Sequence, residues 1–263
     1  MTTGTSVAAG SYLALNELWY KDQGQANFHL YNDNDQWLQM DKAGHAMASY
    51  YLASLGYQSL KWAGIKNKTA LYLGGSFGLI YLTGIEVLDG FSTTWGFSVG
   101  DELANLAGAG FYIGQEELWG EQRIKLKYSF LQSSYASKRP NVLGSGLSEQ
   151  FIKDYNGQAY WFSINIHSFL PESSRFPRWL NFAVGYGGDG MIYGSPQDQL
   201  ADDSFSQVQR QRQLYLSLDI DLSKIETNSK ALKTVFEVFG FLKIPAPAVE
   251  FNQFSSPEFY WFR

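Results

Sequence analysis

Cysteine is absent from the chain, and its absence excludes several kinds of site. A chain without thiols has no disulfide, no thiolate metal centre and no cysteine nucleophile, and the sequence as given has no cysteine to carry a lipid anchor. Charged residues are also scarce, at 17% of 263 residues, and they sum to a formal net charge of -5. Because proteins that bind nucleic acid concentrate Lys and Arg to neutralise phosphates, we expect no nucleic acid partner.

The chain also lacks the motifs of common nucleotide-dependent and hydrolytic enzymes. No Gly-x-Ser-x-Gly, Walker A, Rossmann or His-Glu-x-x-His pattern occurs in it, so we expect no nucleotide partner. Residues 1–22 show no basic segment followed by a long apolar run, and we therefore expect no export signal within this chain.

Aromatic residues, in contrast, are abundant. Phe, Trp and Tyr make up 17% of the sequence, with 17 Tyr and 8 Trp. Tyr and Trp join an apolar body to a polar tip, which suits interfaces, including the headgroup region of a membrane. A large aromatic core explains the same composition, so both interpretations stay open.

Residues 36–120 predict a bundle of three helices. Apolar residues recur with helical spacing over about 37–57, 69–91 and 98–119. Apart from Glu86, the second segment is apolar over about the length that crosses a bilayer. Gly and Tyr dilute it, and we expect a buried helix of the bundle in preference to a membrane span. Glycine and alanine recur in the second and third helices, which predicts close packing between them.

From residue 122 onward the pattern alternates between apolar and polar residues, as in β-strands. The segments with this pattern are 123–130, 159–167, 180–188, 213–222, 248–252 and 258–263. Each has one apolar face and one small or polar face. An antiparallel sheet with its apolar face on the helices and its polar face in water fits this pattern. A small membrane barrel with its apolar face in lipid fits it as well.

We therefore predict an α+β fold in which an N-terminal three-helix bundle packs with a C-terminal antiparallel β-sheet. The helical subdomain is expected at 1–121 and the strand-rich subdomain at 122–263, intimately packed. A small outer-membrane β-barrel with associated helices is the alternative, but about six strands are fewer than closure usually needs. Two further helical segments, near 148–155 and from 229, also favour the sheet with helices.

Each of the three N-terminal helices carries one pair of polar residues. The pairs are Asp41 with His45, Glu86 with Asp89, and Asp101 with Asn105. Their spacings of three or four residues place each pair on one helical face. Ser98, three residues before Asp101, matches a capping box with Asp in place of the usual Glu. If the helices are neighbours, the three pairs form one site with an imidazole, several carboxylates and an amide.

Two chemical roles and one structural role fit these residues. His45, with Asp41 and Glu86, suits general acid/base catalysis because an imidazole titrates near neutral pH. His45, Glu86 and Asp101 also suit a divalent metal, with Asp41 behind the imidazole; no other cofactor is expected. In the structural interpretation Asp101 caps its helix, Asp41 caps or pairs with Lys42, and Glu86 fixes the register of the bundle. The sequence leaves this choice open.

A further acidic segment lies in the loop before the first helix. Asp33, Asn34 and Asp35 offer oxygen ligands that calcium accepts, but the spacing of an EF-hand loop is absent. We therefore interpret this segment as a turn.

Three segments, "DKAGHA", "GIEVLDGF" and "WGFSVGDELANLAGAG", resemble the succession of motifs in YfiM-like envelope lipoproteins and, more distantly, in VanZ-like membrane proteins. The family pattern is D-K-x-x-H, then a helix ending in E-x-x-D, then G-x-S-x-x-D-x-x-x-[ND]-x-x-G-A. The resemblance covers about residues 36–115. The remainder looks like the long form of that family in Gram-negative bacteria, with a strand-rich C-terminal half.

The resemblance implies a location in the cell envelope, in the periplasm or outer membrane, and a family without an established activity. By motif position it points to Asp41, Lys42, His45, Glu86, Asp89, Asp101 and Asn105. The chain departs from the family because it has no lipobox cysteine. Two hypotheses follow. One is a non-enzymatic structural component that binds a membrane lipid or an envelope protein complex. The other is a metal-assisted or acid/base hydrolase of an envelope lipid or glycan that uses His45.

Overall fold

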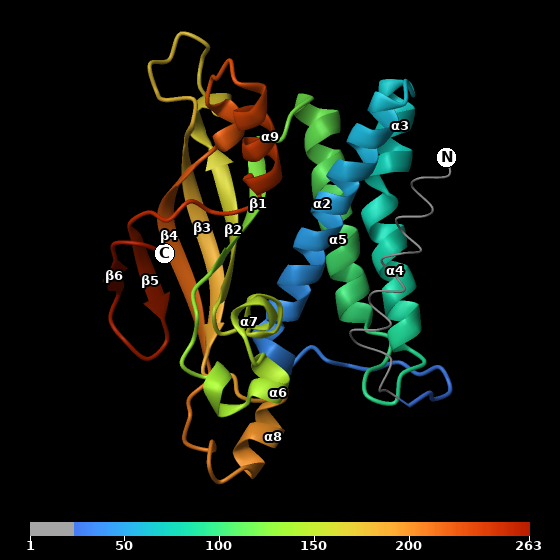
Figure 1. Cartoon of the computed structure of the whole chain (residues 1–263), viewed down its shortest axis with the longest axis vertical. Coiled ribbons are helices and arrows are strands. Elements are labelled where there is room, and N and C mark those ends of the chain that lie inside the picture. The colour runs from blue at the N-terminus through green and yellow to red at the C-terminus, as the bar shows by residue number, and fades with distance from the viewer. Residues whose placement is uncertain (1–23) are drawn as a thin grey trace.

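The computed structural model describes residues 24–263, and the segment considered above as an export signal lies outside the described residues. A group of helices lies beside a sheet (Figure 1), which confirms the predicted α+β fold. The helices of the first half are α2 (Met40–Trp62), α3 (Asn67–Gly75), α4 (Phe77–Asp89) and α5 (Val99–Trp119). The strands are β1 (Ile124–Phe130), β2 (Gln158–Asn165), β3 (Leu180–Asp189), β4 (Gln211–Ile220), β5 (Ala248–Asn252) and β6 (Glu258–Tyr260). The shorter helices are α6 (Pro140–Leu143), α7 (Leu147–Lys153), α8 (Pro196–Ala201) and α9 (Lys230–Phe239).

The helical half is built around α2, which packs against α3, α4 and α5. The second predicted helix is divided at Ser76 into α3 and α4, and the first begins at Met40, three residues later than expected. By length and composition alone, Asn67–Asp89 is apolar enough to cross a membrane. Its inner side packs in the bundle, whereas its outer side exposes apolar residues, among them Leu73 and Ile80.

Glycines set how closely these helices approach each other. A Cβ added at Gly108 of α5 would lie 2.0 Å from the Ala46 carbonyl oxygen of α2, and one at Gly78 of α4 would lie 2.2 Å from that of Ser49. Neither position has room for any side chain. Both α4 and α5 therefore press their backbones against α2, and the polar residues that they carry are brought to the same part of that helix.

Replacing Gly108 by alanine is therefore expected to lower the free energy of unfolding by about 1–3 kcal/mol, because the added methyl group overpacks the helix contact. Gly110, on the same helix, has open space around its Cβ position. G110A is expected to stabilise the protein by about 0.5–1 kcal/mol, since alanine favours helix over glycine. Denaturant melts of the two variants, followed by circular dichroism, test this contrast. Equal stability of G108A and G110A would contradict the close approach.

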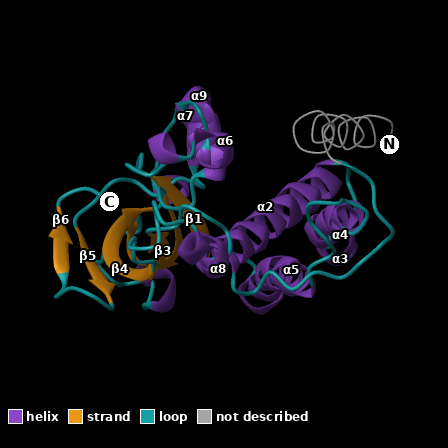
Figure 2. Cartoon of the chain, turned by 90° about the horizontal axis from the view of Figure 1, so that it is seen from below, coloured by secondary structure: helices purple, strands orange, loops and turns teal. Residues whose placement is uncertain are grey.

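The six predicted strands are all present and form one antiparallel sheet in chain order, from β1 to β6. Within residues 24–263, β1 and β6 are not paired with each other, so the sheet is open and the barrel alternative is wrong for these residues. The sheet is strongly curled (Figure 2). Lys127 of β1 reaches Asp219 of β4 at 2.6 Å, although two strands separate β1 from β4 and neighbouring strands lie about 4.8 Å apart.

The exposure of the two faces of the sheet differs from our expectation. The polar face is the buried one: Asp219 is 0% exposed and Lys127 is 1% exposed. The apolar face is largely open, with Leu214 at 54% and Leu218 at 47% exposed. The sheet curls around its polar face, and segment 241–247 covers that face, where the Ile244 N–H donates to Asp219 at 3.0 Å. The prediction that the polar face meets water is therefore wrong.

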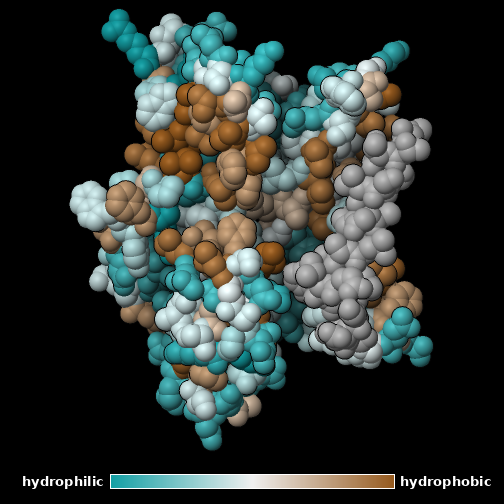
Figure 3. Space-filling model, viewed as in Figure 1, coloured by the Kyte–Doolittle hydropathy of each residue, from teal (hydrophilic) through white to brown (hydrophobic). Residues whose placement is uncertain are grey.

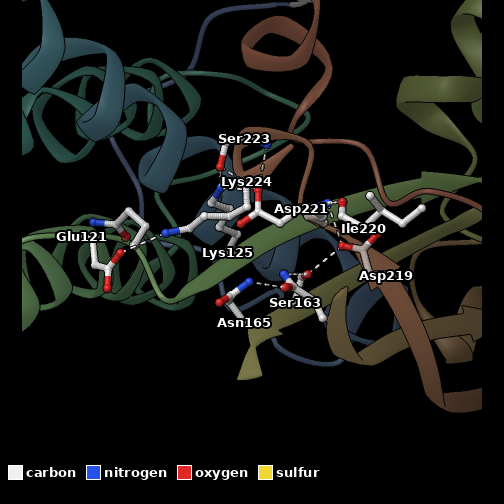
Figure 4. A network of polar contacts seen from close by, with 12 residues as sticks. Glu121, Lys125, Ser163, Asn165, Asp219, Ile220, Asp221, Ser223 and Lys224 are labelled. Atoms are coloured by element: carbon white, nitrogen blue, oxygen red, sulfur yellow. Dashed lines mark hydrogen bonds and ion pairs between the residues drawn. The ribbon is translucent and has the colours of Figure 1, made fainter. Parts of the chain in front are cut away.

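A connected set of polar contacts lies on the concave side (Figure 4), where the rings of Trp161 and Tyr215 are also buried. Asp219 accepts a hydrogen bond from the Ser163 hydroxyl at 2.6 Å, and Ser163 accepts one from Asn181. Lys125 pairs with Asp221 at 2.7 Å. Because these groups are desolvated, their mutual hydrogen bonds are what makes their burial tolerable.

The convex, apolar side of the sheet faces the helical half, but contacts it only in part. The Phe111 ring of α5 meets the Phe162 ring of β2 edge-on, with 5.8 Å between centroids. The Tyr51 hydroxyl of α2 donates to the Leu126 carbonyl of β1 at 2.5 Å. Between these contacts the surface is hollowed, and apolar side chains gather on this front of the molecule (Figure 3).

Candidate functional site

Polar residues from three helices meet at the N-terminal half of α2. Five of the six residues in the predicted pairs gather there: Asp41, His45, Glu86, Asp101 and Asn105. The sixth, Asp89, lies one turn beyond Glu86 on α4, and its charge contributes to the raised pKa of Glu86. The polar residues of the three predicted helices therefore lie together in the structure, as their helical spacing indicates.

His45 is held between α5 and α4. Its Nδ1 lies 3.0 Å from the Asn105 amide oxygen, which requires a proton on that nitrogen because an amide oxygen only accepts. Its Nε2 faces the Glu86 carboxylate at 3.7 Å. Asn105 is fully buried, and Glu86 is nearly so. The imidazole therefore has a fixed orientation and turns Nε2 toward the carboxylates.

Lys42 and Ser98 connect the remaining carboxylates. The Lys42 ammonium lies 2.7 Å from Asp33 and 3.1 Å from Asp101. The Ser98 hydroxyl donates to Asp33 at 2.7 Å and accepts from the Asp101 N–H at 3.1 Å, which is the predicted helix cap. The Ser98 N–H donates to Glu86 at 3.1 Å, so Glu86 occupies the place that a capping box gives to its acidic residue.

Asp41 connects the site to the strand-rich half. It accepts a hydrogen bond from the Tyr155 hydroxyl at 2.5 Å, and Tyr155 follows α7 in the chain. Burial and the neighbouring charge of Asp41 raise the pKa of Tyr155 well above its ordinary value. Tyr155 therefore stays a neutral donor, and Asp41 stays its acceptor.

The entry to α2 is a strained segment that sets the position of Asp41. Trp37, Leu38 and Gln39 have φ values of 45°, 50° and 62°, a left-handed conformation that costs about 1–2 kcal/mol per residue for amino acids other than glycine. Contacts from the sheet hold it: the Tyr186 hydroxyl donates to the Leu38 carbonyl, and Arg212 donates to the Gln39 side chain at 2.6 Å.

Acidic groups outnumber basic groups at this site. Four carboxylates, those of Asp33, Asp41, Glu86 and Asp101, face one ammonium and one imidazole. Burial raises the pKa of Glu86 to about 7, with the charge of His45 opposing the shift. Burial, and then the charge of Asp41, raise the pKa of Asp101 to about 7. Close to neutral pH, these two carboxyl groups therefore hold protons that carboxyl groups in water would have lost.

The basic groups and Asp33 respond to the same surroundings. Burial opposes a charged imidazole, but the charges of Asp41, Asp101 and Glu86 outweigh it and raise the pKa of His45. Burial works against the charged form of Asp33 as well, yet hydrogen bonds from Asp101, Lys42 and Ser98 lower its pKa. The pKa of Asp33 is thus lowered and that of the neighbouring Asp101 is raised.

Three of these residues are placed to share a ligand. Asp41, His45 and Asp101 each offer one atom, and the three atoms lie within 4.8 Å of one another. The set differs from the predicted one, since Asp41 takes the place given to Glu86. Glu86 instead accepts a hydrogen bond from the Ser98 N–H, and its other carboxylate oxygen lies 3.7 Å from the imidazole Nε2 of His45.

Sequence reasoning missed two residues that complete the site. Asp33 was interpreted as part of a turn, but its carboxylate accepts from Lys42 and Ser98. Tyr155 ends the helical segment predicted near 148–155, and no motif of the sequence connects it with Asp41. For Asp33 the only signal was its position in the loop rich in Asn and Asp that precedes the first predicted helix. For Tyr155 the chain offers no local signal, since it lies 114 residues from Asp41.

Similarity to a known protein family is found in the helical half of the chain. Residues 30–114 match the model of a family described as a predicted periplasmic lipoprotein (DUF2279). No curated protein matches the chain, and no solved structure matches it. The matched segment contains every residue of the site except Tyr155, whereas the whole sheet lies outside it. The family description names no activity.

Proposed function

We propose that the protein is a non-enzymatic component of the cell envelope that contacts membrane lipid through the apolar face of its sheet. The observation that carries the proposal is the inverted sheet, in which Lys127 and Asp219 are buried while Leu214 and Leu218 are exposed. In water this orientation is unfavourable for folding, because the apolar surface stays hydrated while the charged side chains lose their hydration. Against lipid it is favourable. The description of the matched family as periplasmic lipoproteins supports an envelope location.

The extent and the border of the apolar face favour lipid over a small protein contact. Half-exposed apolar residues stand on three neighbouring strands: Phe162, Phe182, Leu214, Leu216 and Leu218. Monomeric proteins in water rarely expose a contiguous apolar patch of this kind without a partner. Trp179, directly before β3, and Trp261, directly after β6, are also exposed. Indole rings at strand ends are typical of the membrane interface.

The purified chain is expected to float with vesicles of phosphatidylethanolamine and phosphatidylglycerol in a density gradient. The double variant L216N/L218N is expected to bind them at least tenfold more weakly. Each half-exposed leucine contributes about 1 kcal/mol on leaving water, and about 1.4 kcal/mol corresponds to a factor of ten. Because the contact is apolar, high salt should leave flotation unchanged.

A matched control for this experiment is L170N/L200N. Both leucines are exposed, at 40% and 66%, but Leu170 lies in the loop after β2 and Leu200 on α8, away from the open face. This variant should float like the unmodified chain. Equal flotation of L216N/L218N and the unmodified chain would overturn the lipid contact.

A second candidate function is the binding of a divalent cation by Asp41, His45 and Asp101. The observation that favours it is their mutual distance of at most 4.8 Å, close to the separation of about 3–4 Å between ligands of one zinc ion. The excess of carboxylates at the site would also be offset by such a cation. Metal-assisted hydrolysis of an envelope lipid or glycan, with His45 as a ligand or base, is the activity that this site would support.

Addition of Zn²⁺ or Mn²⁺ at 100 times its dissociation constant is expected to stabilise the protein by about 2.7 kcal/mol. For a chain of this size, that raises Tm by about 5–10 °C. D101N should abolish the increase, whereas E117Q, a change at an exposed carboxylate on the far part of α5, should retain it. An equal increase in D101N and in the unmodified chain would show that the ion binds elsewhere.

A further inference from the structure

Two adjoining pockets open between α2 and the apolar face of the sheet. The first, about 360 Å³, lies between Ala43 and Ala46 of α2 and Phe162 and Val184 of the sheet. The second, about 420 Å³, continues past Met47 toward α9. Met47 and Tyr160 line both of them. Each has the volume of a small-molecule site, about 300–1,000 Å³, and together they form one cleft.

The cleft exists because the residues of α2 that face the sheet are small and leave space unfilled. Ala43 and Ala46 stand opposite the sheet where a leucine or phenylalanine would fill the space. At Gly44 the helix comes close, since an added Cβ would lie 3.0 Å from the Tyr160 hydroxyl. The bundle itself is tightly packed around α2, as Gly78 and Gly108 show. The space is thus confined to the side of α2 that faces the sheet.

The lining of the first pocket suits a hydrocarbon chain. Its side chains are apolar or aromatic apart from Lys127, and the Lys127 ammonium is turned to the opposite face, where it pairs with Asp219. A peptide in this pocket would bury N–H and C=O groups without partners, which is costly. It also finds no strand edge to extend, because β2 and β3 are each paired on both sides.

The second pocket adds one charge at the far end of the cleft. Glu237 of α9 lines it, next to Val238. Among the described residues, no cation lies within ion-pair distance of Glu237. An exposed, unpaired carboxylate at the mouth of an apolar cleft complements a positively charged head group and repels a negatively charged one.

We propose that this cleft binds one acyl chain of a lipid whose head group carries an ammonium, with the chain beside Ala43 and Ala46 and the ammonium at Glu237. The inference rests on the proposed lipid contact and names the class of lipid that enters the protein. The sheet face then meets the bilayer, while the cleft holds a single amphiphile drawn from it.

Isothermal titration with lysophosphatidylethanolamine, below its micellar concentration, tests the proposal on the full chain. Saturable binding at one site is expected. V184F, which fills the cleft from the sheet wall, should weaken it at least tenfold, and A43F should do so from the helix wall. F182L, on the same sheet face but outside the pocket lining, is the control that should bind normally.

E237K identifies the head group. It should weaken lysophosphatidylethanolamine at least fivefold and strengthen oleate, whose head group is a carboxylate. No saturable binding, or equal binding by V184F, A43F and the unmodified chain, would overturn the cleft site. Unchanged selectivity in E237K would overturn the ammonium assignment.

The membrane contact of the sheet face and the lipid site in the cleft can be tested independently of each other. L216N/L218N removes residues outside the pocket lining, so it should lose vesicle flotation and keep binding of the single-chain lipid. V184F and A43F add apolar area, so they should float while losing that binding. If V184F is poorly folded by circular dichroism, A43F decides the result from the other wall.

Discussion

Replacing Lys127 by methionine is expected to lower the free energy of unfolding by about 3–5 kcal/mol, because it leaves a buried carboxylate without its partner. The Lys127 ammonium lies 2.6 Å from Asp219 and donates to the Ile220 carbonyl at 2.8 Å. Neither side chain of the ion pair is accessible to water. Loss of the ammonium removes the only cation at hydrogen-bond distance from Asp219 among the described residues.

The expected loss of stability comes from the Asp219 carboxylate, which K127M leaves charged and buried without its paired cation. A second variant that also removes this charge tests that explanation. In K127M/D219N both charges are gone: the amide oxygen can take the place of Oδ1 and accept from the Ile244 N–H, while the amide nitrogen in the place of Oδ2 can donate to the Ser163 hydroxyl. This double variant should regain most of the lost stability in urea melts. R178M is the control, because Arg178 and Glu226 are exposed and 3.9 Å apart, and such pairs contribute about 0–1 kcal/mol. If K127M matched R178M, the polar face would not be buried.

The alternating pattern was sufficient to find the strands but not to orient them. Alternation assigns Lys127 and Asp219 to one face and Leu214 and Leu218 to the other. Which face is covered depends on how the sheet curls and on what lies against it. The covering segment 241–247 has no regular pattern of its own, so nothing in it predicts contact with Asp219. If the apolar face is assumed to be the buried one, as in most soluble proteins, the polar face is wrongly placed in water.

The convergence of the site's polar side chains was largely predictable because helical spacing constrains it. Asp41 and His45 share a face of α2, and the close approach of Gly108 to Ala46 brings α5 with its Asp101 against that helix. The loop residue Asp33 and the distant Tyr155 were not predictable in this way, since neither lies at a periodic position.

The strained segment Trp37–Gln39 was also beyond prediction. Helical spacing began at residue 37, but three residues without glycine adopt left-handed φ values there. Their conformation is imposed by the sheet, through Tyr186 and Arg212. Local propensity cannot foresee a conformation that tertiary contacts stabilise against it.

Raising the pH from about 5 to about 8, in the presence of a chelator, is expected to lower the free energy of unfolding by about 3 kcal/mol. The pKa of Glu86 is about 7 in the folded chain, against an ordinary value of 4.5, and that of Asp101 is about 7, against 3.8. Between these limits the folded chain binds more protons than the unfolded chain, so stability falls as pH rises. The raised pKa of His45 acts in the same direction.

The other charged groups of the site do not reverse this trend. The lowered pKa of Asp33 adds stability above an ordinary value of 3.8, so its contribution is complete before pH 5 is reached. The raised pKa of Lys42 keeps that group charged throughout the range. The fall in stability between about pH 5 and pH 8 is therefore assigned to Glu86, Asp101 and His45.

Substitution by amides separates these contributions. E86Q keeps an oxygen to accept from the Ser98 N–H but cannot ionise, so it should be more stable than the unmodified chain at about pH 8 and should have a flatter pH profile. D101N should flatten the profile as well, and E117Q should not, because Glu117 is exposed. Urea melts at four or more pH values measure the slopes. A slope in E86Q as steep as that of the unmodified chain would mean that Glu86 ionises without cost, and that the site is open to water instead of being closed by α2, α4 and α5.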